Sequence, residues 1–288
     1  MNPKIVLRAD GNSTIGLGHV YRLLALADIL KDDFEIVFAI SCPDEFLKSV
    51  IEKYVHTIIE LPAVQYKLPA LKKPEEEIPF DLSDYLKGNE IVVTDGYWFG
   101  EQYQKAVKGT GTKLVCIDDL TTIDYKHADA VINHSPGLST QDFVISKQTK
   151  LYLDLDYLLL RKDFFEPVPE KNFSVKNIYV SFGGFDYYGI TNTVVKYCLG
   201  LDNIDKIHVV YTHHFRREKT EELIALQEKN IEKLVLHIGL NASEIVLIIY
   251  QCNYAIASSS TVSLELIARQ IKQFLILTAD NQLKAFSE

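Results

Sequence analysis

His19 is the residue of this 288-residue chain best suited to acid–base chemistry, and it follows a polar loop near the amino terminus. An imidazole that is largely neutral near pH 7 can take a proton from water or from a hydroxyl group. Asp10 opens the same loop, and we predict that its carboxylate orients His19. The spacing alone also allows the simpler interpretation that His19 only begins a helix.

The elements around His19 are predicted to be a strand, a loop and a helix. Residues 5–7 form a short β-branched apolar run, and residues 20–30 repeat apolar side chains at three- and four-residue steps. Such a loop lies at the carboxyl edge of a parallel sheet, where ligands bind. Gly16 and Gly18 would let the backbone approach a ligand closely. The loop is not a dinucleotide fingerprint, because Tyr21 replaces the third glycine, and the chain has no P-loop.

The segment formed by residues 8–27 has the sequence RADGNSTIGLGHVYRLLALA. It resembles the amino-terminal signature of the UDP-2,4-diacetamido-2,4,6-trideoxy-altrose hydrolases of pseudaminic acid biosynthesis, relatives of the GT-B glycosyltransferases in the MurG-like superfamily. Later segments are similar to the same family in the same order, at residues 93–97, 117–119, 157–161, 181–184 and 279–282. The first segment is specific, and the others gain weight from their order.

The resemblance implies an α/β, GT-B-like fold with two Rossmann-like parallel-sheet lobes facing a central cleft. Alternating strand and helix patterns in both halves predict two parallel-sheet lobes as well. We expect an N-terminal lobe over residues 1–155, with the His19 loop and the sugar side of the cleft. A C-terminal nucleotide-binding lobe would cover residues 156–288 and be shorter at its end than in many relatives.

The resemblance also implies the binding residues. Those expected at the sugar are Arg8, Asn12, Gly16, Gly18, Arg22, Asp95, Tyr97, Arg161 and Asn281. Those expected at the nucleotide are Ser181, Gly183, Gly184, Ser259, Ser260, Thr261, Glu265 and Gln282. Hydroxyls and backbone N–H groups at a helix start suit a diphosphate, and Glu265 resembles the carboxylate that holds ribose hydroxyls.

Structural alternatives stand beside these assignments. Asp95 could cap a helix, Arg161 could form an interdomain salt bridge, and the serine run 258–260 could be a helix cap. Two departures from the family pattern, Gly96 and a serine run without glycine, would permit a related amino sugar.

The function expected from this reading is hydrolysis of a UDP-activated diacetamido-trideoxy sugar to free sugar and UDP. His19 would activate the attacking water, and neither a metal nor a cofactor is required. This step would belong to the biosynthesis of a pseudaminic-type acid or a surface polysaccharide. An inverting GT-B glycosyltransferase that uses a UDP-sugar is the first alternative, and an inactive sugar-nucleotide-binding relative is the second.

Composition limits the partners. A formal net charge of −9 argues against a nucleic acid. Four scattered cysteines without a C-x-x-C pair indicate buried thiols, not a zinc site or a disulfide framework. No apolar run reaches the length of a membrane span, and no signal segment is apparent, so we expect a cytoplasmic protein, monomeric by default. Asp118 and Asp119 are predicted to order a loop, and His134 is a minor candidate for the site.

Overall fold

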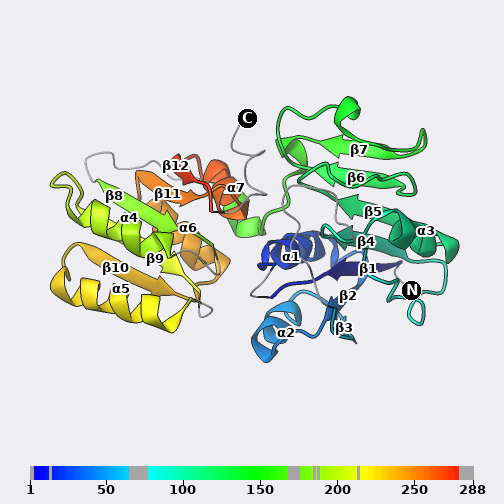
Figure 1. Ribbon diagram of the computed structural model, residues 1–288, viewed down its shortest axis with the longest axis horizontal. Coiled ribbons are helices and arrows are strands. Elements are labelled where there is room, and N and C mark those ends of the chain that lie inside the picture. The colour runs from blue at the N-terminus through cyan, green and yellow to red at the C-terminus, as the bar shows by residue number, and fades with distance from the viewer. Residues whose placement is uncertain are drawn as a thin grey trace. The chain divides into compact units, whose positions relative to one another are not determined.

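The computed structural model describes residues 3–12, 15–64, 77–167, 176–183, 186, 189–212 and 215–278. The chain divides into two compact units between Leu160 and Arg161, and each unit is built on one parallel sheet (Figure 1). This division falls later than residue 155 because the 3-10 helix η2, Leu155–Tyr157, packs beside the last strand of the first unit. There the Tyr152 and Tyr157 rings lie 5.2 Å apart.

The first unit has a seven-stranded sheet in the order β3-β2-β1-β4-β5-β6-β7. Its strands are β1 (Lys4–Ala9), β2 (Glu35–Ser41), β3 (Thr57–Leu61), β4 (Ile91–Asp95), β5 (Lys113–Ile117), β6 (Ala130–Asn133) and β7 (Lys150–Leu153). Every neighbouring pair is parallel, so all the carboxyl ends lie at one edge. The sequence did not predict β7, which is a short edge strand paired only with β6.

Helices connect these strands, namely α1 (Gly18–Leu30), α2 (Glu45–Ile51) and α3 (Glu101–Gly109), with the 3-10 helix η1 at Thr140–Asp142. Asp44 begins α2 by accepting the Leu47 amide at 2.7 Å, a normal N-cap. Residues 83–85 form a turn.

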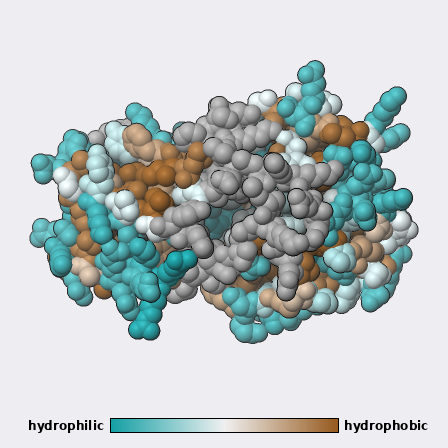
Figure 2. All heavy atoms as spheres, in the orientation of Figure 1, coloured by the Kyte–Doolittle hydropathy of each residue, from teal (hydrophilic) through white to brown (hydrophobic). Residues whose placement is uncertain are grey.

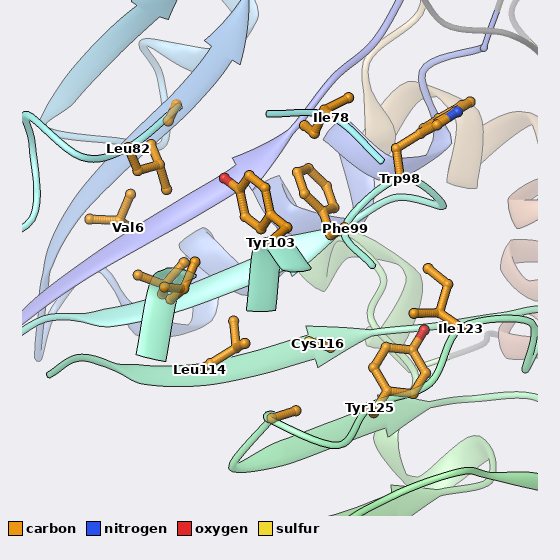
Figure 3. Close-up of a cluster of buried hydrophobic side chains, with 14 of the residues drawn as sticks. Val6, Ile78, Leu82, Trp98, Phe99, Tyr103, Leu114, Cys116, Ile123 and Tyr125 are labelled. Carbon is orange, nitrogen blue, oxygen red and sulfur yellow. The ribbon is translucent and has the colours of Figure 1, made fainter. Parts of the chain in front are cut away.

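The main core of the first unit packs between its sheet and α3. Large aromatic side chains fill it, with Tyr103, Phe99 and Tyr125 buried beside Leu114 and Cys116 (Figure 3). This packing fixes the positions of β4 and β5, whose carboxyl ends carry the polar residues described below.

The second unit has a five-stranded parallel sheet in the order β10-β9-β8-β11-β12. Its strands are β8 (Asn177–Ser181), β9 (Lys206–Tyr211), β10 (Leu234–Ile238), β11 (Tyr254–Ser258) and β12 (Lys272–Ile276). Its helices are α4 (Ile190–Leu199), α5 (Arg217–Lys229), α6 (Ala242–Tyr250) and α7 (Thr261–Ala268), with η3 at Lys162–Phe165. The predicted alternation of strands and helices in this half is confirmed.

Helices α4 and α5 cover the β8–β9–β10 part of one sheet face, where Val195 and Leu223 meet Val209. Apolar atoms remain visible on the second unit in the region of β11 and β12 (Figure 2), where Phe274 is 63% exposed. Within the described ranges, no helix combines the length and the apolar character needed to cross a membrane.

Candidate active site

Polar side chains of the first unit gather at the carboxyl edge of its sheet. Asp95 ends β4, Asp119 follows β5 and His134 follows β6, three neighbouring strands. His19 and Arg22 enter from the first two turns of α1, which follows β1. The edge predicted from the first loop therefore carries groups from four adjacent strand ends.

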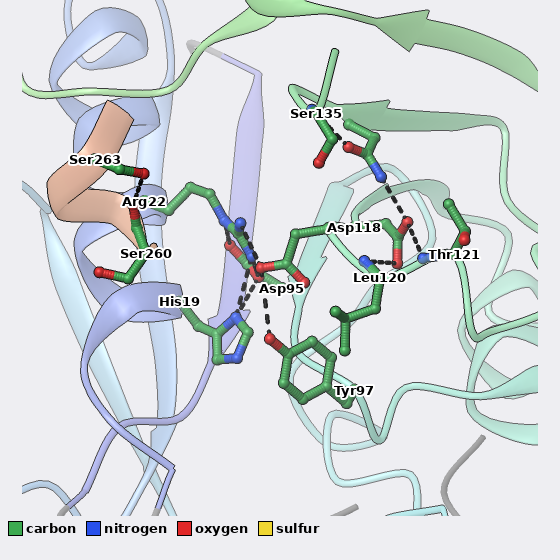
Figure 4. A network of polar contacts seen from close by, with 12 residues as sticks. His19, Arg22, Asp95, Tyr97, Asp118, Leu120, Thr121, Ser135, Ser260 and Ser263 are labelled. Atoms are coloured by element: carbon green, nitrogen blue, oxygen red, sulfur yellow. Dashed lines mark hydrogen bonds and ion pairs between the residues drawn. The ribbon is translucent and has the colours of Figure 1, made fainter. Parts of the chain in front are cut away.

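His19, Arg22 and Asp95 point toward one another (Figure 4). Nδ1 of His19 lies 2.7 Å from Oδ1 of Asp95. Arg22 donates to both oxygens of the same carboxylate, from Nε to Oδ2 and from Nη2 to Oδ1, each at 2.6 Å. Asp95 is fully buried and the other two side chains are nearly so. A buried charge persists only when it is paired and hydrogen-bonded, and this bidentate contact supplies both.

Nδ1 of His19 lies between a carboxylate and a guanidinium, since Arg22 Nη2 is 3.1 Å from the same nitrogen. Burial alone would raise the pKa of Asp95, but the Arg22 guanidinium and His19 outweigh burial and lower that pKa to about 2. Asp95 is therefore a carboxylate at neutral pH and can only accept hydrogen bonds. The short contact with Nδ1 is attractive when Nδ1 carries the proton, which leaves the lone pair on Nε2.

Asp119 and Tyr97 extend this group. Arg22 Nη1 donates to Asp119 Oδ2 at 3.0 Å, and the Tyr97 hydroxyl lies 3.5 Å from the same oxygen. The edge of the Tyr97 ring stands against His19, with 4.8 Å between ring centroids and an interplanar angle of 84°. Tyr97 thus limits the orientation of the imidazole from one side.

Asp119 is a site residue that the sequence did not assign to the site. Burial would raise its pKa, but the Arg22 charge dominates and keeps that pKa below its ordinary value. The sequence feature that could have identified Asp119 is its position two residues after a buried strand, β5, which pairs with β4. By contrast, Asp118 orders the loop as predicted, since its oxygens accept from Thr121 N, the Tyr125 hydroxyl and Asn133 Nδ2.

Asp10 and Arg8 lie in a different contact from the one predicted. The Asp10 carboxylate accepts the Ser41 amide at 2.6 Å and pairs with Arg8 Nη1 at 2.7 Å. Arg8 has no exposed surface, and it also donates to Asp81 at 2.8 Å. The orienting contact on His19 comes from Asp95, so we correct the assignment of that role to Asp10. Arg8 is a buried cation held by two carboxylates, and its predicted sugar contact stays a prediction.

Arg22 and Asp95, both predicted at the sugar, bind each other in the structure. Each is buried, and each uses its charged atoms on the other. These contacts hold His19 in place, and the predicted sugar contacts of Arg22 and Asp95 stay a prediction. The idea that Asp95 caps a helix is wrong as well, because α3 begins after Gly100.

The loop before α1 forms a tight turn. Asn12 and Gly16 exchange backbone hydrogen bonds, and Asn12 Oδ1 accepts the Ile15 amide at 3.1 Å. Gly16 has φ +81°, a conformation that favours glycine. A Cβ added at this position would have no atom within 4 Å, so the backbone conformation and not crowding favours glycine here. Gly18 begins α1, one residue before His19. The predicted close approach of a ligand to these glycines stays a prediction.

In the second unit, Arg161 pairs with Glu265. Nη2 of Arg161 donates to Glu265 Oε1 at 2.8 Å, and the Arg161 guanidinium stacks over Phe164, 5.2 Å from the ring centroid. Burial raises the pKa of Glu265, and the Arg161 charge opposes that rise. Both residues belong to the second unit, so the pair is not an interdomain salt bridge.

The serine run precedes α7, as predicted. Ser260 is the N-cap of this helix, and its hydroxyl accepts the Val262 amide at 3.4 Å. Ser263 donates back to the Ser260 carbonyl at 2.7 Å (Figure 4). Ser259 is buried, and its hydroxyl has no hydrogen-bond partner among the described residues. Thr261 is the first residue of the helix, one turn before Glu265.

The other predicted nucleotide residues lie around β8. Ser181 ends β8 and is buried, and Gly183 has φ +78° in the loop that follows. The Asp186 carboxylate accepts the Ile190 and Thr191 amides, at the start of α4, at 2.9 and 2.8 Å. Gly184, Asn281 and Gln282 lie outside the described residues.

No group of three or more potential metal ligands occurs in the part of the chain that the structure describes. The arrangement at His19 instead offers one nitrogen base, held by a carboxylate and an arginine. Such a set can abstract a proton from water or from an alcohol.

The comparisons with known proteins give distant relatives. No protein-family model matches the chain. It is 28% identical over 230 residues to the uncharacterized protein MJ1062 of Methanocaldococcus jannaschii, covering 75% of this chain and 44% of the relative. It is 26% identical over 187 residues to the UDP-2,4-diacetamido-2,4,6-trideoxy-beta-L-altropyranose hydrolase of Campylobacter jejuni, covering 64% and 61%.

A third relative is the spore coat polysaccharide biosynthesis protein SpsG of Bacillus subtilis, 26% identical over 183 residues, covering 62% of this chain and 50% of the relative. The chain thus spans about half the length of the curated relatives it matches.

Solved structures decide the fold. MurG of Acinetobacter baumannii superposes with a TM-score of 0.61 at 13% identity, covering 99% of this chain and 83% of that one. TcCGT1, solved in complex with UDP, gives a TM-score of 0.62 at 11% identity with the same coverages. The fold is GT-B-like. This result confirms the predicted fold class of two parallel-sheet α/β units.

Proposed function

We propose that this GT-B-like protein hydrolyses a UDP-activated amino sugar and that His19 is the general base. The observation that carries the proposal is the 2.7 Å contact between Asp95 and Nδ1 of His19, which leaves Nε2 as the basic nitrogen. The coarser part of the proposal is that the protein processes sugar nucleotides in polysaccharide biosynthesis. Its support is the hydrolase activity for which the Campylobacter relative is named and the polysaccharide biosynthesis for which the Bacillus relative is named.

In the proposed reaction, a water molecule attacks the anomeric carbon of the sugar. His19 Nε2 takes a proton from that water as the new C–O bond forms, and the bond from the anomeric carbon to the diphosphate oxygen breaks. The electron pair of the broken bond leaves with UDP. The imidazolium that forms is stabilised by the buried Asp95 carboxylate, as in an Asp–His pair of a hydrolase.

Arg22 has a supporting part in this proposal. Its guanidinium neutralises Asp95 and Asp119 and locks both carboxylates in place. Without that charge, the two acids would repel each other and their pKa values would rise. Arg22 therefore keeps Asp95 ionised, which in turn keeps the Nδ1 proton on His19.

We assign UDP to the second unit. Groups suited to a diphosphate occur at the start of α7, where Ser260 and Thr261 begin the helix and the Ser259 hydroxyl has no described partner. Glu265 lies one turn into that helix and would accept from ribose hydroxyls. UDP is a good leaving group, so donors at this helix start would stabilise its developing charge without a general acid.

The finer proposal is that the sugar is a 2,4-diacetamido-trideoxy hexose of the pseudaminic acid type, with Asn12 and Tyr97 at the sugar. A glycosyltransferase is the second candidate, favoured by the superposition on MurG and on the UDP-bound TcCGT1. The same His19 would then activate an acceptor hydroxyl. Fold alone does not separate these reactions.

One experiment separates the hydrolase from its alternatives. UDP release is measured from UDP-2,4-diacetamido-2,4,6-trideoxy-β-L-altrose in ¹⁸O-labelled water, with no acceptor added. The hydrolase produces UDP steadily and places the label in the free sugar, because the C–O bond breaks. Release only after an acceptor is added would identify a transferase, and tight binding without turnover would identify an inactive relative.

A further inference from the structure

We propose that Asp119 and His134 together bind a hydrogen-bond donor of the sugar, either a ring hydroxyl or an amide N–H, and so select the substrate. This inference rests on the proposed function, because it assigns part of the sugar-binding surface of the same site. The two residues have no assigned part in the proton transfer by His19.

The register of the sheet places the two residues side by side. Strands β5 and β6 are parallel, and Ile117 pairs with Ile132 in their ladder. Asp119 and His134 each follow that pair by two residues, so they occupy matching positions past the two strand ends. Successive residues of an extended chain point to opposite faces, so residues 118 and 133 form a separate pair from residues 119 and 134.

The two pairs are used in different ways. Asn133 Nδ2 donates to Asp118 Oδ2 at 2.8 Å, and Asp118 takes further bonds from its own loop, so this pair closes on itself. In the other pair, Asp119 Oδ1 and His134 Nδ1 are both buried and have no hydrogen-bond partner among the described residues. A buried polar atom without a partner costs free energy, so two of them at one strand edge indicate a place built for a ligand.

The charges around His134 indicate which ligand groups fit. Burial lowers the pKa of His134 to about 4, and the nearby Arg22 charge lowers it too, against the opposing effects of Asp119 and Asp95. The imidazole of His134 therefore interacts electrostatically with the charged residues of the site, and it is neutral at neutral pH. Asp119 stays ionised because the Arg22 charge lowers its pKa.

An anionic carboxylate beside a neutral imidazole rejects a second anion and accepts a neutral donor. Asp119 Oδ1 can only accept, so it requires an O–H or an N–H from the ligand. His134 can donate to the same group or accept from it. A sugar hydroxyl can donate to Asp119 while its oxygen accepts from His134, and an acetamido N–H can share its hydrogen between Asp119 Oδ1 and an unprotonated His134 Nδ1. A phosphate oxygen has no hydrogen to donate to Asp119.

The test compares the affinities of UDP and of the altrose-configured UDP-sugar by calorimetry. In His134→Ala we expect the UDP-sugar affinity to fall about tenfold, the loss of one buried hydrogen bond, while UDP affinity stays unchanged. His134→Asn keeps an amide nitrogen near the position of Nδ1 and should recover most of the affinity. His127→Ala is the matched control, because His127 lies in the same unit and pairs only with the surface carboxylate of Glu101 in the described contacts.

A 3-deoxy analogue of the same UDP-sugar separates the two donor groups. That sugar has its one free ring hydroxyl at C3, so the wild type and His134→Ala would bind the analogue equally if the hydroxyl is the donor. A persistent difference would assign an acetamido N–H instead. Thermal unfolding of each variant shows that it is folded, and His134→Leu replaces His134→Ala if the alanine variant does not fold.

An equal loss of affinity for UDP and UDP-sugar in His134→Ala, or no loss for either, would overturn this inference. The proposed function fails separately. If the wild type binds the UDP-sugar more tightly than UDP and His134→Ala loses that advantage without any turnover occurring, the sugar-binding pair stands and the hydrolase does not.

Discussion

Asp95 Oδ1 and His19 Nδ1 lie 2.7 Å apart in a group from which water is nearly excluded. The two residues are separated by 76 positions and come from different elements, the end of β4 and the first turn of α1. Arg22, one turn further along α1, binds the same carboxylate with two donors. This contact orients the imidazole, and the proposed chemistry requires the tautomer that carries its proton on Nδ1.

Asp95→Asn tests the role of that carboxylate. The amide can no longer neutralise Arg22 or stabilise an imidazolium, so we expect kcat to fall at least about a hundredfold with little change in KM. Breaking a buried ion pair should also lower the free energy of unfolding by about 3 kcal/mol. Urea unfolding and steady-state kinetics measure the two effects. Glu45→Gln, at a surface carboxylate that is 92% exposed, should change neither. An unaltered kcat in Asp95→Asn would remove Asp95 from the mechanism.

His134 should make the stability of the protein depend on pH. Its pKa is lowered from 6.5 to about 4 in the folded state, so the unfolded chain binds a proton that the folded chain refuses between these pH values. The stabilising contribution is present above pH 6.5 and is lost as the pH falls toward 4.

Urea unfolding at pH 7 and pH 4.5 measures this effect. His134→Asn should lose less stability over that range than the wild type, by about 2 kcal/mol. Burial also lowers the pKa of His208 to about 4, but His208 changes the stability of both proteins equally. Parallel pH curves for the two proteins would contradict the prediction.

Ser259→Ala tests the proposed diphosphate contact at α7. The hydroxyl is buried and has no described partner, so its removal breaks no hydrogen bond in the free protein, and thermal stability should be unchanged. The affinity for UDP should fall about fivefold to tenfold when the donor is lost. Ser243→Ala, on α6 of the same unit, is the control with unchanged UDP affinity. Wild-type UDP affinity in Ser259→Ala would place the diphosphate elsewhere.

Arg161→Met tests whether Glu265 acts as a carboxylate toward the nucleotide. Without the Arg161 charge, burial would raise the pKa of Glu265 further, so a larger fraction would be protonated near neutral pH. We expect UDP to bind the variant more weakly at pH 6 and to recover affinity as the pH rises to 8. Arg217→Met, at an arginine whose side chain is 91% exposed, should leave the pH dependence of binding unchanged. A flat affinity profile in Arg161→Met would exclude this role.

The fold could be predicted from the sequence because each strand and helix has a local residue pattern. Buried parallel strands read as short apolar runs, such as residues 91–94, and helices as periodic stripes, such as residues 20–30. Strand β7 was not predicted because its partly exposed edge residues, Lys150–Leu153, form only a weak apolar pattern. The end of the first unit was placed too early for the same reason, since η2 packs on that unnoticed strand.

The candidate site could be predicted only in part from the sequence. His19 and the strand ends could be located, because a strand–loop–helix puts its loop at the sheet edge. The partners of each charge could not, because they depend on contacts far apart in sequence. Asp10 is nearer to His19 along the chain, yet it pairs with Arg8 and Ser41, while Asp95 from an adjacent strand takes the imidazole. Asp119 was read as a loop residue because nothing in the sequence shows that Arg22 reaches it.

The most direct test of the account is UDP release from the altrose-configured UDP-sugar, without acceptor, by the wild type and by His19→Gln. Glutamine keeps polar atoms at the position but supplies no base near neutral pH. We expect steady UDP release by the wild type, a fall of at least about a thousandfold in the variant, and equal affinity of both proteins for UDP. Release by His19→Gln at the wild-type rate would contradict the central claim, because another group would then activate the water.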